Sequence, residues 1–226
     1  MALAHMADTK VPFVEIDFTA RSDGVVFDTT KRDVAESEGL GQGRFKPLIS
    51  PLERGYLLEG LYEFLKDKSE GSYTVEIEPE KAFGAKDPKK TRLLSLGKFR
   101  QNDMNPHPGM EVEVDGARGV VKNVSSGRVI VDFNHPMAGK TVVYEVELKR
   151  FVSDPGECFK ALLRLILSVP EELVSAERDG SKLKVVISLK RQVPDAMFAE
   201  IARMGSELIE GIDEILVEQK VESEDA

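Results

Sequence analysis

The strand predicted over residues 142–148 constrains the fold of this chain more than any other feature. Val142, Tyr144, Val146 and Leu148 alternate with polar residues, which is the period of a half-buried β-strand. The strands predicted in the preceding segment pair with one another and leave no partner for this strand. We therefore predict that the chain returns here to an earlier sheet, in which this strand is central.

The segment before that strand, residues 88–133, is predicted to be an inserted small β domain. Asp115-Gly116 and Ser126-Gly127 are hairpin turn signals that separate its strands. The apolar positions of the three strands are Met110, Val112 and Val114; Val120, Val121 and Val124; and Val129, Val131 and Phe133.

Residues 10–87 are strand-rich and form the first part of the interrupted domain, which resumes over 134–153. Alternating apolar residues around Ile16 lead to an Asp23-Gly24 turn, and this turn delivers Phe27-Asp28 to the next strand. A short amphipathic helix over 57–65 and a half-buried strand over 73–77 are predicted to follow.

Residues 155–226 are predicted to form a separate α+β domain, which begins at the boundary signal Asp154-Pro155-Gly156. Its expected elements are a helix over 157–168, strands over 173–176 and 183–189, a helix over 194–208 and a strand over 214–221. The acidic end is expected to fray. Residues 1–9 read as an N-terminal tail that contains a vector scar. The whole chain is thus predicted to be α+β.

Composition excludes several classes of partner. The chain has 31 basic and 40 acidic residues and a net charge of -9, whereas a nucleic-acid binder needs a basic surface. No apolar run approaches the roughly 20 residues that span a bilayer, and no signal segment opens the chain. The single Cys158 excludes an internal disulfide and indicates a reducing cytoplasm.

Four short motifs occur in order along the chain. They are Asp23–Thr30 (DGVVFDTT), Leu57–Leu61 (LLEGL), Pro79–Gly84 (PEKAFG) and Asn134–Lys140 (NHPMAGK). With the insertion, they make residues 10–152 resemble FKBP-type peptidyl-prolyl isomerases of the SlyD-like branch, in the long archaeal form with an insert-in-flap domain. The last 70 or so residues resemble the extension of that long form more weakly.

The resemblance implies an FKBP-like antiparallel sheet wrapped around a short helix, and a proline pocket at its surface. The implied pocket residues are Phe18, Phe27, Asp28, Leu57, Leu58, Leu61, Phe83 and Tyr144. The residues implied to bind substrate around it and in the insert are Leu48, His135, Met137, Val112, Val114, Val129 and Phe133. No metal and no cofactor are implied. Phe18 and Phe83 lack the hydroxyl of the tyrosines that occur at these positions in the family.

Rotation of an X-Pro bond suits such a pocket because its barrier of about 18–20 kcal/mol comes from amide resonance. A site that favours the twisted amide over the planar one lowers that barrier. Asp28 would orient the substrate, and the backbone N–H of Leu58 would hold a substrate carbonyl, as the family implies. The insert is expected to bind unfolded chains as an added strand.

Other interpretations remain open on the residues alone. Periodicity equally fits pocket residues that are ordinary core, Asp28 as a turn or cap residue, and His135 as a polar loop residue. The apolar helix over 159–167 is either a core helix or the seam of a homodimer. The alternative functions are a polypeptide-binding holdase with an inactive pocket and an assembly factor that docks through residues 155–226.

Overall fold

The computed structural model describes residues 10–41, 45–190 and 192–221. The predicted tail over 1–9 and the acidic end over 222–226 lie outside the described residues. The chain divides into two compact units, Met1–Ile77 with Val142–Ala226, and Glu78–Thr141. The α+β class is confirmed, with mostly antiparallel sheets and few helices. The three-domain division predicted from the sequence stays a prediction.

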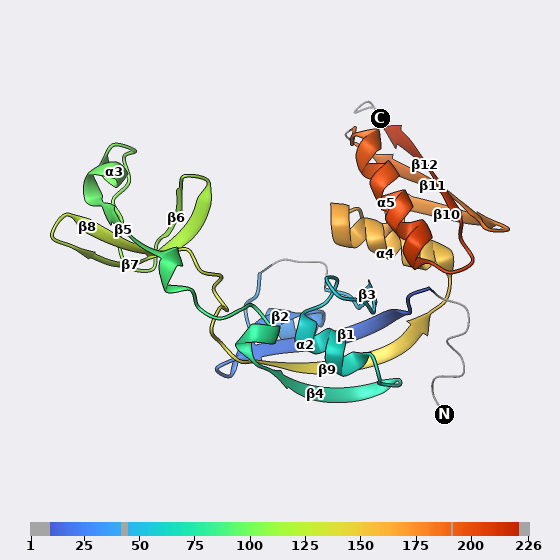
Figure 1. Ribbon diagram of the computed structural model, residues 1–226, viewed down its shortest axis with the longest axis horizontal. Coiled ribbons are helices and arrows are strands. Elements are labelled where there is room, and N and C mark those ends of the chain that lie inside the picture. Colours follow the sequence, from blue (N-terminus) through green and yellow to red (C-terminus); the bar gives the residue numbers. More distant parts are fainter. Residues whose placement is uncertain (1–9, 42–44, 191, 222–226) are drawn as a thin grey trace. The chain divides into compact units, whose positions relative to one another are not determined.

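The main sheet of the first unit has the order β2-β1-β9-β4, and β3 pairs with β1. The strands are β1 (Phe13–Ser22), β2 (Val25–Thr29), β3 (Leu48–Pro51), β4 (Gly71–Ile77) and β9 (Val142–Val152). All of these pairings are antiparallel. β9 lies between β1 and β4 (Figure 1), so the prediction of a returning central strand is confirmed.

A tight turn and a short helix shape this sheet. Asp23 and Gly24 both have positive φ, 52° and 79°, as a two-residue hairpin turn requires. Helix α2 (Glu59–Leu65) begins two residues later than predicted, because Leu58 has an extended backbone and occupies the N-cap. α2 approaches β4 closely: a Cβ on Gly60 would overlap with Cγ2 of Ile77.

Two elements of this unit were not predicted. β3 is flanked by Pro47 and ends at Pro51, and it lies at the edge of the sheet. Prolines argue against a strand in sequence-based prediction, although edge strands tolerate them. Helix α1 (Arg32–Ser37) has no side-chain cap and buries only Ala35, so its sequence shows no apolar stripe.

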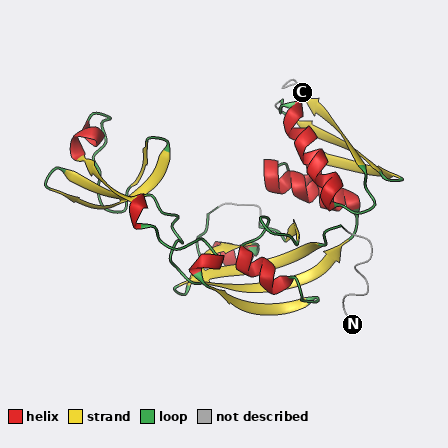
Figure 2. Cartoon of the chain, viewed as in Figure 1, coloured by secondary structure: helices red, strands yellow, loops and turns green. Residues whose placement is uncertain are grey.

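The second unit contains an antiparallel sheet of order β5-β8-β7-β6 (Figure 2). Its elements are β5 (Thr91–Ser95), α3 (Leu96–Arg100), β6 (Glu111–Val114), β7 (Ala117–Ser125) and β8 (Arg128–Asp132), with 3₁₀ turns η2 (Pro79–Lys81) and η3 (Pro88–Lys90). Both predicted hairpin turns are confirmed by positive φ at their two residues. Phe99 of α3 completes a valine-rich core.

The C-terminal part of the first unit has the predicted succession of elements. They are α4 (Pro155–Leu167), η4 (Glu171–Leu173), β10 (Val174–Asp179), β11 (Lys182–Leu189), α5 (Asp195–Leu208) and β12 (Glu214–Val221). β10 and β11 form an antiparallel hairpin, and β12 pairs parallel to β11. Asp154 caps α4 by accepting a hydrogen bond from the N–H of Glu157 at 2.7 Å. No helix in the described ranges is long and apolar enough to cross a membrane.

Candidate functional site

An aromatic cluster forms where β1, β2 and β9 meet. The ring centroid of Tyr144 lies 5.4 Å from that of Phe18, tilted by 46°, and 6.4 Å from that of Phe27, nearly edge-on at 83°. Aromatic pairs prefer such tilted and edge-on arrangements to a face-to-face sandwich. Phe18 and Tyr144 are buried and Phe27 is half-buried. The structure therefore brings together three of the predicted pocket residues.

Asp28 supplies the carboxyl beside this cluster. Its side chain is exposed at the surface, but neighbouring atoms withdraw part of its hydration, which raises the pKa of the carboxyl, while a hydrogen bond with the Thr29 backbone acts in the opposite direction. Burial, and then the charge of Asp28, raise the pKa of the Tyr144 hydroxyl. At neutral pH the Tyr144 hydroxyl is therefore neutral and can donate a hydrogen bond.

Two threonines fix the strand that carries Phe18, a role that was not predicted. The Phe18 N–H donates to Oγ1 of Thr30 at 2.8 Å, and the Thr29 hydroxyl donates to the Phe18 carbonyl at 2.9 Å. The Thr30 hydroxyl also donates to Asp17 at 2.7 Å. These bonds pin β2 to β1 at the cluster. In the sequence, the two threonines after Asp28 stand out only as the end of the motif DGVVFDTT.

The predicted floor residues belong to the same unit. Leu57 and Leu58 are half-buried and lead into α2, whose Leu61 is 2% exposed. The N–H of Tyr62 donates to the carbonyl of Leu58 at 2.9 Å and closes the first turn of the helix. Leu48 is half-buried on β3.

In the second unit, Phe83 and His135 form a stacked pair. Their ring centroids are 4.5 Å apart and their planes differ by 3°. The N–H of Met137 donates to Nδ1 of His135 at 3.1 Å, which makes Nδ1 an acceptor and places the proton of the neutral ring on Nε2. The N–H of Gly139 donates to the carbonyl of Gly84 and joins the two loops. Three predicted site residues thus come together here.

The predicted binding residues of the insert are distributed between core and surface. Val112, Val114 and Val129 are buried in the core of the second unit. Phe133 is half-buried, and the guanidinium of Arg92 lies 5.2 Å from the centroid of its ring. The three valine side chains are therefore core residues, which was one of the two interpretations open from the sequence. Their role in binding stays a prediction.

A buried carboxylate that the sequence did not single out braces the two segments that lead into and out of the insert. Asp132 accepts hydrogen bonds from the side chain and backbone of Asn134 at 2.7 and 3.0 Å, and Lys86 lies 3.1 Å away. The Asn134 side chain also donates to the Asp87 carbonyl and accepts from its N–H. Burial alone would raise the pKa of Asp132, but Asn134 and Lys86 lower it to about 2.

Comparison with known proteins places this geometry in a family. The family described as "FKBP26, IF domain" matches residues 92–137. An FKBP-type 16 kDa peptidyl-prolyl cis-trans isomerase of Escherichia coli is 30% identical over 126 residues, which are 53% of this chain and 84% of that protein. The chain belongs to the FKBP-type peptidyl-prolyl cis-trans isomerase family.

Other relatives cover more of the chain. A short-type peptidyl-prolyl cis-trans isomerase of Methanocaldococcus jannaschii is 28% identical over 143 residues, 62% of this chain and 91% of that protein. The FKBP-type isomerase SlyD of Treponema pallidum is 29% identical over 162 residues, 66% of this chain and 81% of that protein. The resemblance to FKBP-type isomerases, including SlyD, that the four motifs indicated is thereby confirmed, and the long archaeal form stays a prediction.

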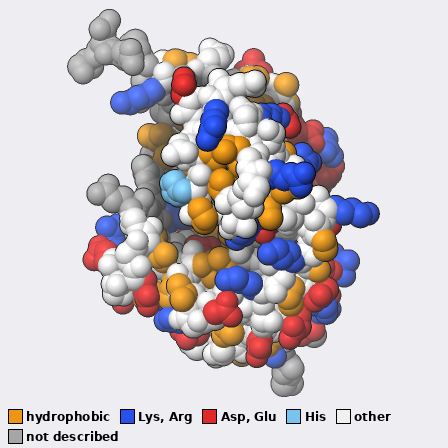
Figure 3. All heavy atoms as spheres, turned by 90° about the vertical axis from the view of Figure 1, so that its left-hand side faces the viewer, with side chains coloured by type: hydrophobic (Ala, Val, Ile, Leu, Met, Phe, Trp, Pro, Cys, Tyr) orange, Lys and Arg blue, Asp and Glu red, His pale blue; other side chains and the backbone are white. Residues whose placement is uncertain are grey.

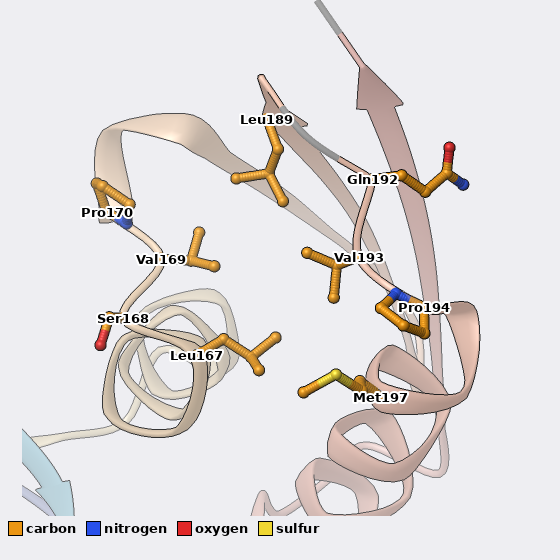
Figure 4. A pocket seen from close by; sticks show the side chains of 9 residues that line it. All are labelled: Leu167, Ser168, Val169, Pro170, Leu189, Gln192, Val193, Pro194 and Met197. Carbon is orange, nitrogen blue, oxygen red and sulfur yellow. The ribbon is translucent and has the colours of Figure 1, made fainter. Parts of the chain in front are cut away.

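The C-terminal part of this FKBP-type chain carries an apolar hollow of its own (Figure 4). Its volume is about 340 Å³, and its lining residues are Leu167, Ser168, Val169, Pro170, Leu189, Gln192, Val193, Pro194 and Met197. Figure 4 shows Leu167, Val193 and Met197 turned toward one another, with the Gln192 amide pointing away. No side chain in this lining is ionisable, and its one hydroxyl belongs to Ser168. Across the described ranges, no group of three or more His, Cys, Asp or Glu side chains is arranged to hold a metal.

Proposed function

We propose that this protein is a peptidyl-prolyl cis-trans isomerase with chaperone activity, which rotates X-Pro bonds in unfolded or partly folded polypeptides. The observation that carries the proposal is the cluster of Phe18, Phe27 and Tyr144 beside Asp28, in a chain of the FKBP-type family. Its relatives bear the names isomerase and SlyD. The single Cys158, which is buried, agrees with a cytoplasmic site of action.

The chemistry asks for no nucleophile, because no covalent bond is broken. An apolar wall that excludes water from the amide disfavours its planar, charge-separated form relative to the twisted one. The aromatic cluster would supply that wall, and Leu48, Leu57, Leu58 and Leu61 would extend it. Tyr144 would donate a hydrogen bond and Asp28 would orient the substrate. Phe83, His135 and Met137 remain predicted members of the site.

A protease-coupled assay on a proline-containing tetrapeptide tests this proposal. The wild type should accelerate isomerisation above the uncatalysed rate. Asp28→Ala should lower kcat/KM by about tenfold, the loss expected when one orienting contact of roughly 1.4 kcal/mol disappears. Asp33→Ala, which removes an exposed carboxylate from α1, is the matched control and should leave kcat/KM unchanged. A wild type that gives only the background rate would exclude isomerase activity.

We further propose that the second unit captures polypeptide at a free sheet edge. The Phe133 N–H donates to the Lys90 carbonyl and the Leu96 N–H to the Gly127 carbonyl. In an antiparallel ladder this alternation turns the N–H of Leu93 away from β8, toward the open side of β5. The Leu93 side chain is 57% exposed. An extended segment could therefore pair with β5 as an added strand.

A pair of proline substitutions tests which edge is used. Leu93→Pro removes an outward N–H of β5 without breaking its pairing with β8. Glu113→Pro does the same on β6, because the Val121 N–H donates to the Met110 carbonyl and the ladder therefore turns the Glu113 N–H outward. Leu93→Pro should weaken binding of an unfolded, carboxymethylated protein, while Glu113→Pro should not. Equal affinities for both variants and the wild type would rule out capture at β5.

The homodimer expected through the C-terminal part also remains a proposal. In α4, Phe159, Leu162 and Leu163 are buried in the core, so only its end offers an apolar seam, where Ile166 is 40% exposed. Met197, at 44%, lines the hollow of Figure 4. Light scattering of Ile166→Lys against the wild type tests this surface: a monomer in both at high concentration would remove the dimer.

A further inference from the structure

The C-terminal part and the main sheet of the first unit share one hydrophobic core. Phe13 of β1 and Val152 of β9, 0% and 1% exposed, belong to the same cluster as the buried side chains of α4, α5 and β11. The Val11 N–H donates to the Leu208 carbonyl at 3.1 Å, and Arg164 donates to the Pro47 carbonyl at 3.3 Å. The C-terminal part and the main sheet are therefore packed against each other and joined by hydrogen bonds, and are not connected by a linker alone.

Tyr56 is the member of this contact that lies closest in sequence to the predicted pocket floor. Its ring packs against the shared core from the turn that precedes Leu57 and Leu58. Its burial, and then the charges of Glu53 in the turn and Glu207 on α5, raise the pKa of its hydroxyl. One side chain thus connects the C-terminal helix to the start of α2.

Several contacts hold the turn that carries Tyr56. The Leu52 N–H donates to the Pro12 carbonyl at 2.7 Å at one end of the turn. Gly55 has φ +93°, a conformation that favours glycine. Arg54 lies 3.8 Å from Glu59 and 3.9 Å from Glu63, and so it ties the turn to α2. These contacts join the turn to β1 on one side and to α2 on the other.

β3 receives the same support. α4 packs on β3, and Ile49 contacts the shared core. Successive strand residues face opposite sides, so Leu48, a predicted site residue, points away from the face that α4 covers. The C-terminal helices thus back both segments that carry Leu48, Leu57 and Leu58.

We infer that Tyr56 is a positioning residue of the isomerase site: wedged against the C-terminal core, it fixes Leu57 and Leu58 where the substrate proline binds. The inference rests on the proposed isomerase function. It makes the C-terminal part a structural component of the site, in addition to any partner that this part binds.

The test compares Tyr56→Ala with Val185→Ala in the full chain, at a temperature where both are folded. Val185, on β11, is 1% exposed in the same core and is distant in sequence from the turn. Tyr56→Ala should lower kcat/KM for the tetrapeptide by about tenfold, because small misplacements of binding groups are costly. Val185→Ala should lower the unfolding temperature comparably and keep kcat/KM within about twofold of the wild type, since it removes packing alone. Tyr56→Phe, which keeps the ring, should restore activity.

Hydrogen exchange of the Tyr62 amide supplies a readout that does not need catalysis. This amide closes the first turn of α2 on the Leu58 carbonyl. Its exchange should accelerate in Tyr56→Ala and stay near the wild-type rate in Val185→Ala. Equal exchange and equal activity in the two variants would overturn the positioning role. A different outcome separates the two proposals: the wild type could lack activity while Tyr56→Ala still exchanges faster. That result would contradict the isomerase function but support the positioning of Leu57 and Leu58 by Tyr56.

Discussion

At the scale of single residues, close contacts decide where the site can form. Gly60 lets α2 approach β4, because any side chain there would meet Ile77. Thr29 and Thr30 hold Phe18 in register with β2 through their hydroxyls. Neither feature involves a group that touches substrate in the proposed mechanism, yet both fix groups that do. The identity of these small residues is therefore as constrained as that of the aromatic residues.

Gly60→Ala should destabilise the first unit by about 1–3 kcal/mol, the usual cost of overpacking a helix–sheet contact. Urea unfolding followed by circular dichroism measures this loss. Gly97→Ala is the matched control, because its added Cβ would come no closer than 3.4 Å to Oγ of Ser95. A Gly60→Ala variant as stable as the wild type would mean that α2 lies farther from β4 than described.

Asp132 should make the free energy of unfolding of the second unit fall at low pH. The pKa of its carboxyl is about 2 in the folded chain against the ordinary 3.8, so its contribution is complete above about pH 4 and disappears as the pH falls toward 2. The contribution is on the order of 1–2 kcal/mol, since the side chain is 8% exposed and paired with Lys86. Asp132→Asn should lose it at neutral pH.

The measurement is the difference in urea midpoint between wild type and Asp132→Asn at pH 6 and at pH 2.5. That difference should shrink at the lower pH. Asp103→Asn, at an exposed turn, serves as control and should differ little from the wild type at either pH. A difference that stays constant with pH would show that Asp132 acts through its shape and not its charge.

At the scale of elements, the two edges of the insert sheet carry opposite charge. β5 contains Arg92 and follows the basic residues Lys89 and Lys90, whereas β6 contains the acidic residues Glu111 and Glu113. Lys98 of α3 and Asp115 pair with each other at 2.8 Å. Figure 3 turns this unit toward the viewer and shows Lys and Arg side chains around hydrophobic ones. An extended partner segment should therefore be selected by its charge as well as by its apolar content.

An apolar peptide flanked by glutamates should bind the insert several-fold tighter than the same peptide flanked by lysines. The preference should weaken as salt rises from about 0.05 to 0.5 M, because exposed charges are screened over a shorter distance. Fluorescence anisotropy with two labelled peptides measures it. Lys89→Glu with Lys90→Glu should reverse the preference, and indifference to both changes would argue against electrostatic selection.

Elements with a strong period were predictable, and elements held by distant contacts were not. The alternation of β9 and its missing local partner predicted its central place, and the Asp-Gly and Ser-Gly turns predicted the hairpins of the insert. β3, α1, β5 and α3 escaped prediction because prolines, poor caps or shortness leave them dependent on tertiary packing. The aromatic cluster was predicted from the family resemblance, since periodicity cannot distinguish pocket from core.

At the scale of the whole molecule, the shared core predicts that the main sheet and the C-terminal part of the first unit unfold together. Phe13→Ala should cost about 3–5 kcal/mol, because it removes a fully buried ring. Hydrogen exchange in increasing denaturant should show amides of β1 and α4 losing protection in one step, earlier than in the wild type. Val121→Ala, in the separate core of the insert, should leave that step in place. Two separate steps would contradict a common core.

The central place of β9 also sets an order of events during synthesis. β1 and β4 cannot be joined until the chain has been made through Val152, whereas all strands of the insert sheet are complete at Asp132. Domains generally fold as their chain emerges. A nascent copy therefore presents a finished insert while the sheet that surrounds the aromatic cluster is still open, so binding of polypeptide can precede isomerisation in the life of each molecule.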